Sequence, residues 1–131
     1  MTTTSALHIP RTLFGANAIG QLPQELAPLG VRRPLLVPDR GIVPAGIAAR
    51  VMAACGDDVR PALFDTVTEN PLFADADAGA GRYQAQRCDG VLALGGGSVI
   101  DTAKLIALLA THPRRVADYG GVPGARIGGA A

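Results

Sequence analysis

The chain has 131 residues, a length typical of a single domain, and its 12 basic and 11 acidic residues leave a net charge of +1. This balance excludes the strongly charged surfaces that bind nucleic acid or an anionic membrane, so we expect neither partner. Hydrophobic residues make up 48% of the sequence and aromatic residues only 4%, which predicts a core of close-packed aliphatic side chains. The sequence has no secretory signal, no apolar run of membrane-spanning length and no paired cysteine motif, and these features predict a soluble, cytoplasmic protein.

Hydrophobic periodicity predicts strands and helices that alternate along the chain. Apolar runs predict strands, and these cover residues 8–15, 34–39, 59–67 and 90–95. Segments with apolar residues three or four positions apart predict helices, and these cover residues 19–29, 43–54, 73–87 and 99–110. Gly30 and Gly56 follow two of these helices as stop signals.

Two of the predicted helices have features that bear on packing. Gly79 and Gly81 lie inside the helix over residues 73–87 and should weaken it by about 1 kcal/mol each relative to alanine. The helix over residues 99–110 is apolar almost all round, so we expect it to be buried on most sides.

The alternation of strands and helices predicts an α/β fold, a Rossmann-like parallel sheet with helices on both faces. In such sheets ligands bind outside the carboxyl ends of the strands. Asp39, Asn70 and three consecutive glycines, the glycine turn (residues 95–97), each follow a predicted strand. The sequence therefore predicts that these groups converge on a nucleotide site at one edge of the sheet.

The glycine turn lies between a predicted strand and a predicted helix, which is the arrangement that holds a phosphate. Glycines let the backbone approach a ligand closely, and the helix that follows directs its unpaired N–H groups at the same point. We expect Ser98 to be the N-cap of this helix and Asp101 to complete a capping box. The alternative interpretation is a flexible glycine loop followed by an ordinary helix cap.

Asp39 ends the predicted strand over residues 34–39 and is a candidate for binding the cofactor ribose. Its carboxylate can accept both hydroxyls of an adenosine ribose and would repel a 2′-phosphate, which favours NAD over NADP. The adjacent Arg40 can attract a 2′-phosphate, so NADP is also possible. The alternative is an ordinary turn in which Asp39 acts as a cap. The acid precedes the glycines here, whereas in the usual dinucleotide fingerprint it follows them.

The segment GGGSVIDTAK, preceded by an apolar strand and Asp89, resembles the signature segment of the iron-containing (group III) alcohol dehydrogenase family. The resemblance extends over residues 8–121, through the segments PRTLFGANAIGQLPQEL, LLVPDRGIVPAG, TENPLF and VADYGG. It implies that residues 1–131 are the NAD-binding amino-terminal domain of such an enzyme.

The resemblance also implies roles for individual residues in binding the cofactor. Asp39 would bind the adenosine ribose and Asn70 would line the cofactor site. The residues expected to contact the pyrophosphate or complete its binding segment are Gly96, Gly97, Ser98, Val99, Ile100 and Asp101. Lys104 occupies the family's lysine position, but an ion pair with Asp101 or a solvated side chain is the simpler explanation, so no role is assigned to it.

In the family, a helical carboxy-terminal domain supplies one aspartate and three histidines to a catalytic metal, usually Fe²⁺ and sometimes Zn²⁺. That domain is absent from this sequence, whose only histidines, His8 and His112, are interpreted as surface residues. We therefore assign no catalytic and no metal-binding residue within residues 1–131, and we expect the metal only in a full-length parent protein.

The resemblance implies hydride transfer between a small-molecule alcohol or aldehyde and NAD, in an enzyme that forms homodimers or larger assemblies. The 131-residue piece alone is expected to lack activity. Two alternatives stay open. One is a maleylacetate reductase, although that related family tends to lack the acid found here as Asp101. The other is a nucleotide-binding module without catalysis.

Overall fold

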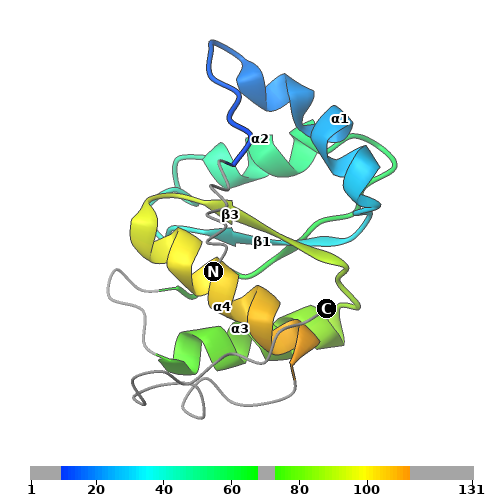
Figure 1. Ribbon diagram of the computed structural model, residues 1–131. Helices are drawn as coiled ribbons and strands as arrows, with labels where there is room; N and C mark the ends of the chain where they lie inside the picture. Colours follow the sequence, from blue (N-terminus) through cyan, green and yellow to red (C-terminus); the bar gives the residue numbers. More distant parts are fainter. Residues whose placement is uncertain (1–9, 68–72, 113–131) are drawn as a thin grey trace, which may run out of the picture.

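The computed structural model describes residues 10–67 and 73–112. Three parallel strands form one sheet, and helices cover both of its faces (Figure 1). In chain order the elements, with η for a 3₁₀ helix, are η1 (Ala18–Gln21), α1 (Leu22–Leu26), η2 (Ala27–Leu29), β1 (Pro34–Pro38), α2 (Ile47–Ala54), β2 (Ala62–Leu63), α3 (Phe73–Ala85), β3 (Gly90–Leu94) and α4 (Gly97–Thr111). The predicted α/β fold is confirmed.

The central strand of the sheet is β1, which pairs in parallel with β2 on one edge and with β3 on the other. Leu36 lies opposite Leu63 of β2 and opposite Leu92 of β3. All five residues of β1 are buried, because neighbouring strands cover its edges and helices cover its faces.

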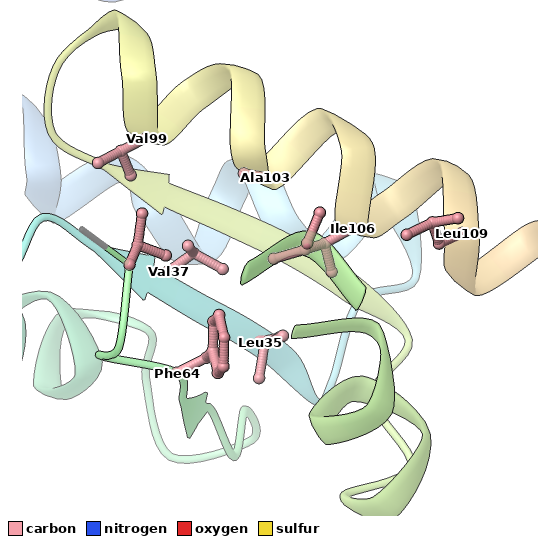
Figure 2. Close-up of a cluster of buried hydrophobic side chains, with 9 residues drawn as sticks. Leu35, Val37, Phe64, Val99, Ala103, Ile106 and Leu109 are labelled. Carbon is pink, nitrogen blue, oxygen red and sulfur yellow. The ribbon is translucent and has the colours of Figure 1, made fainter. Parts of the chain in front are cut away.

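The two faces of β1 belong to two separate cores, because successive side chains of a strand point to opposite sides. Leu35 and Val37 pack in one core with residues of α3 and α4, and Figure 2 shows them beneath α4 together with Phe64. Leu36 points the other way and packs with Ala48 and Val51 of α2. One uninterrupted apolar run therefore attaches helices to both faces.

Asp89, just before β3, links the starts of β1 and β3. Its carboxylate accepts hydrogen bonds from the backbone N–H groups of Arg32, at 3.0 Å to Oδ2, and of Arg33, at 2.7 Å to Oδ1. The backbone N–H of Asp89 in turn donates to the carbonyl of Arg33 at 3.0 Å. These bonds fix the register in which Pro34 faces Gly90.

The observed elements differ from the predicted ones at several places, and the predicted helix over residues 19–29 is divided into η1, α1 and η2. Residues 10–15, the described part of the predicted first strand, form no strand; they have no partner strand among the described residues, and the side chain of Phe14 is fully exposed. The predicted helix over residues 43–54 begins only at Ile47, because Gly46 adopts a left-handed conformation with φ of 75°. The predicted strand over residues 59–67 is reduced to Ala62–Leu63, directly after Pro61, which lacks an N–H to donate.

The prediction that the last helix is buried on most sides is wrong for the part of the chain that the structure describes. The buried residues of α4 form a single stripe, and they are Val99, Thr102, Ala103, Ile106 and Leu109. Asp101 and Lys104 are exposed, and Ile100 is 40% exposed. The helix lies along the sheet with α3 at its side, so the described elements cover only one of its faces (Figure 1).

Gly79 marks the place where α3 packs closely against α4. A Cβ atom at this position would lie only 2.7 Å from Cγ1 of Ile106 and 3.1 Å from Cε1 of Phe64. Ile106 is completely buried and has little room to move. Gly79 therefore permits the helix contact, whereas the sequence suggested only a loss of helix propensity. A Cβ at Gly81, in the same helix, would meet nothing within 4 Å.

Substitution of these two glycines by alanine should change stability in opposite directions. Gly81→Ala should raise the free energy of unfolding by about 0.5–1 kcal/mol, because alanine favours the helix and fits the open site. Gly79→Ala should lower it by about 1–3 kcal/mol, because the new methyl group overpacks the core around Ile106. Urea unfolding followed by circular dichroism measures both. Equal midpoints for the two variants would contradict the close packing at Gly79.

Candidate functional site

The carboxyl ends of β1 and β3 meet at the glycine turn. The backbone N–H of Asp39, the residue after β1, donates to the carbonyl of Leu94, the last residue of β3, at 2.8 Å. Gly95 follows with φ of 149°, which L side chains rarely adopt. A Cβ at Gly95 would lie 3.0 Å from the Cβ of Asp39 and 3.3 Å from Cγ2 of Val99. The strand pairing thus brings Asp39 and the glycine turn together.

The start of α4 differs from the predicted one. Gly96 is the N-cap residue, with φ of −85° and ψ of −168°, and no side chain caps the helix. The first intrahelical bond runs from the N–H of Ile100 to the carbonyl of Gly96 at 3.1 Å. The predicted capping box of Ser98 and Asp101 is therefore wrong, because the chain enters the helix two residues before Ser98. The N–H groups of Gly97, Ser98 and Val99 have no acceptor four residues back in the helix.

Two of the three glycines have no role in the packing of the described residues. A Cβ at Gly96 or at Gly97 would meet nothing within 4 Å, and neither residue has a positive φ. Only Gly95 is required by its conformation and by its close neighbours. Glycine at the other two positions leaves the backbone at the start of α4 without side chains, which lets a ligand such as a phosphate group approach it closely.

The side chain of Asp39 is held in a turn. Its Oδ1 accepts a hydrogen bond from the backbone N–H of Gly41 at 3.0 Å, so the ordinary turn considered as an alternative is present. Its Oδ2 has no hydrogen-bond partner within the described ranges 10–67 and 73–112. The turn therefore orients the carboxylate and leaves one oxygen available to a ligand.

The topology of the sheet identifies the same place independently. The chain leaves β1 into α2, which packs on the Leu36 face, and it leaves β3 into α4, which packs on the opposite face with Leu35 (Figure 1). The two strands are neighbours, so the connections diverge between them. In open parallel sheets such a switch point is where ligands bind, and here Asp39 and Gly95 flank it.

The remaining predicted site residues are placed as follows. Ser98 is exposed, whereas the side chain of Val99 is 3% exposed and belongs to the core, so Val99 offers a ligand only its backbone. Ile100 and Asp101 are exposed on the outer side of α4. Nζ of Lys104 lies 4.0 Å from Oδ1 of Asp101, which confirms the ion-pair interpretation. Asn70 lies outside the described residues.

Two surface pockets lie away from the switch point. One, of about 390 Å³, lies beside η2 and the end of α2, with Val31 and Cys55 in its lining. The other, of about 470 Å³, lies between β2 and α3, with Phe64 and Arg82 in its lining. Neither pocket is lined by a predicted site residue.

No group of three or more His, Cys, Asp or Glu side chains that can hold a metal ion occurs among the described residues. His112, at the end of α4, lies with Nδ1 2.9 Å from Oγ1 of Thr111 and 3.2 Å from the carbonyl of Leu108. His8 lies outside the described residues. The donor set that the structure describes therefore does not fit a catalytic metal. None of the described helices is both long enough and apolar enough to cross a bilayer.

The two cysteines are free thiols. Burial raises the pKa of Cys55 above its ordinary value of 9.0. Burial and then Asp89 raise the pKa of Cys88, while Arg33 and Arg82 act in the opposite direction. Both thiols are accordingly protonated near neutral pH, a state in which cysteine is a poor nucleophile.

Residues 10–128 match the family model described as iron-containing alcohol dehydrogenase. The chain is 43% identical over 108 residues to 4-hydroxybutyrate dehydrogenase of Cupriavidus necator, an alignment that covers 82% of this chain and 28% of that protein. It is 41% identical over 106 residues to choline dehydrogenase of Bacillus subtilis (strain 168), covering 80% of this chain and 26% of that protein.

Among solved structures, the fold is similar to that of sulfoacetaldehyde reductase from Bifidobacterium kashiwanohense in complex with NAD+. The TM-score is 0.76 at 27% sequence identity, and the match covers 82% of this chain and 28% of that one. The chain thus spans little more than a quarter of the length of the relatives that it matches.

The first and second glycines of the turn should respond differently to substitution. Gly95→Ala should lower the free energy of unfolding by about 1–3 kcal/mol, because alanine is strained at this φ and its methyl group crowds Asp39 and Val99. Gly96→Ala is the matched control and should change stability by no more than about 0.5 kcal/mol. Urea titration of both variants measures the difference. A Gly95→Ala protein as stable as the control would show that the turn is not constrained as described.

Proposed function

Because this chain belongs to the iron-containing alcohol dehydrogenase family, we propose that residues 1–131 form the cofactor-binding domain of an NAD-dependent oxidoreductase that interconverts an alcohol and an aldehyde. One observation carries the proposal. Asp39 and the start of α4 meet across Gly95, and a Cβ at Gly96 or Gly97 would meet nothing within 4 Å. The solved relative in complex with NAD+ supports the choice of cofactor.

In this proposal the start of α4 binds the pyrophosphate of the cofactor. The N–H groups of Gly97, Ser98 and Val99 donate to the phosphate oxygens, and the positive end of the helix dipole adds to the attraction. Hydrogen bonds to a charged group are worth about 1.5–3 kcal/mol each. The side chain of Val99 is buried in the core, so the turn is already held in place before a ligand arrives.

Asp39 binds the adenosine ribose through the carboxylate oxygen that the turn leaves available. Oδ1 stays bonded to Gly41, and Oδ2 accepts a ribose hydroxyl. A 2′-phosphate at this place would face a carboxylate, so NAD is preferred over NADP even with Arg40 nearby. Asn70, Ile100 and Asp101 complete the proposed contact set, with Asn70 assigned from the sequence alone.

The cofactor, held by Asp39 and the start of α4, would supply a hydride acceptor for the oxidation of the alcohol. The described residues position the cofactor and supply neither a substrate pocket nor metal ligands. We assign the Fe²⁺ or Zn²⁺ ligands and the catalytic groups to a further helical domain of a longer protein, since the relatives are more than three times as long as the matched region. The 131-residue chain by itself is then inactive.

The proposed setting is the cytoplasm, where the free thiols Cys55 and Cys88 stay reduced. The proposed partners are a small-molecule alcohol or aldehyde and a second copy of the protein. Leu13 and Ile19 are partly exposed, and Phe14 is fully exposed, which gives an apolar surface suited to contact between copies.

Gly97→Val should weaken NADH binding by at least about tenfold, because its side chain fills the space in front of the N–H groups. Gly81→Val is the matched control, since it places the same side chain at an open glycine of α3, away from the site. NADH fluorescence titration gives the affinities, and circular dichroism with urea unfolding shows that both variants are folded. Unchanged NADH affinity in Gly97→Val would refute the proposed phosphate site.

Asp39→Ser should lower the ratio of the affinities for NAD+ and NADP+ by about tenfold, because removing the carboxylate removes its repulsion of the 2′-phosphate. Asp58→Ser, at an exposed aspartate outside the site, should leave the preference unchanged. Calorimetric titration of each variant with both cofactors measures the ratio. A wild-type chain that binds NADP+ more tightly than NAD+ would overturn the assignment of Asp39.

A further inference from the structure

A surface pocket at the amino ends of β1 and β2 takes no part in the proposed cofactor site. Its volume is about 390 Å³, which lies within the range of small-molecule pockets. Its lining comes from two segments of the chain, residues 23–32 and 55–59, all of which the structure describes. The proposed cofactor site lies at the carboxyl ends of the strands, so the two sites are at opposite edges of the sheet.

Contacts within the fold hold the two lining segments together. Gly56, directly after the end of α2, has φ of 90°, and a Cβ at this position would lie 3.6 Å from Cγ of Pro23 in α1. The N–H of Val59 donates to the carbonyl of Gly56 at 3.3 Å, which closes the turn after α2. Cys55, which also lines the pocket, is 1% exposed. The pocket is therefore formed before a ligand arrives.

The lining combines apolar side chains with charges of both signs. Arg32 contributes a guanidinium group, Asp57 and Asp58 contribute carboxylates, and all three residues are exposed. Among the residues that the structure describes, none of these three side chains forms an ion pair or a hydrogen bond. Opposite charges thus line one pocket without pairing, which leaves one position for an anion and another for a cation. The apolar members of the lining are Pro23, Ala27, Val31, Cys55 and Val59.

We propose that this pocket binds a small zwitterion, a molecule with a carboxylate group and an ammonium group on a short apolar chain. The carboxylate pairs with the planar guanidinium of Arg32, which can donate two parallel hydrogen bonds to it. The ammonium group pairs with Asp57 and Asp58, and the chain packs on the apolar lining. A ligand with a cation alone would leave Arg32 unpaired, and a ligand with an anion alone would face two carboxylates. The pocket shares no residue with the proposed cofactor site, so the inference does not depend on the proposed function.

Binding at this pocket should stabilise the sheet as a whole. The N–H of Arg32 donates to Oδ2 of Asp89 at 3.0 Å, and the carbonyl of Arg32 accepts the N–H of Arg60 at 2.8 Å. The backbone of Arg32 therefore connects β1 to the segments that lead into β3 and β2. A ligand that binds only the folded chain should raise its unfolding temperature.

Calorimetric titration of the 131-residue chain with three probes tests the inference. The probes are 6-aminohexanoate, which carries both charges, and hexanoate and hexylamine, which carry one each. We expect 6-aminohexanoate to bind at least about tenfold more tightly than either single-charge probe, and to raise the unfolding temperature. Arg32→Gln and the double variant Asp57→Asn/Asp58→Asn should each weaken 6-aminohexanoate by about tenfold. The matched controls Arg50→Gln and Asp65→Asn, at exposed residues outside the lining, should leave its affinity unchanged.

Several results would overturn the inference. If hexanoate or hexylamine binds as tightly as 6-aminohexanoate, the pocket does not recognise both charges. If 6-aminohexanoate at about 50 mM shows no binding to a sample that unfolds cooperatively in urea, the pocket is not a zwitterion site. Equal weakening in the control variants would indicate a general effect of surface charge. If saturating NAD+ displaces 6-aminohexanoate, the probe binds in the cofactor site, and the inference fails while the proposed function stands.

Discussion

The parallel pairing of β1 with β3 is the interaction on which the rest of this structure depends. These strands are far apart in sequence, and hydrogen bonds hold them at both ends. At the amino ends the carboxylate of Asp89 binds the N–H groups of Arg32 and Arg33, and at the carboxyl ends the N–H of Asp39 binds the carbonyl of Leu94. The connection through β2 and α3 places β3 on the far side of β1, and this crossover creates the switch point. Without the pairing, Asp39 and the glycine turn would not be neighbours.

The strongest apolar runs made much of this fold predictable. β1 and β3 are short, continuous and apolar, and both were predicted to within one residue of their observed ends. The weaker elements were harder to predict, because their limits depend on backbone conformations and partners that periodicity does not encode. The left-handed conformation of Gly46 places the start of α2 later in the chain than predicted. Residues 10–15 form no strand, because a strand needs a second strand to pair with and none is adjacent among the described residues.

The residue types of the candidate site could be predicted from the sequence, and the sheet topology determines how those residues are arranged. Asp39 and the glycine turn follow predicted strands, so their convergence could be expected from a parallel sheet. The start of α4 could not be predicted. The N-cap residue is Gly96, whereas the sequence predicts Ser98 because serine is a preferred N-cap residue. The sequence predicts only that Gly79 lowers the helix propensity of its segment. Its close contact with Ile106 could not be predicted, because that contact depends on how α3 packs against α4. The turn at Asp39 could also be predicted, because a glycine two residues after an aspartate is a signal for the hydrogen bond that orients the Asp39 carboxylate.

The three glycines of the turn divide into one that the fold needs and two that it does not. Under the proposed function, this division separates two ways in which the protein would lose its activity in a cell. A change at Gly95 lowers the population of native molecules and exposes the protein to proteases, so its abundance falls. A change at Gly96 or Gly97 leaves a well-folded protein that escapes chaperones and degradation. Such a protein would accumulate to normal levels while inert, and in an assembly of several subunits it would compete with functional copies for places.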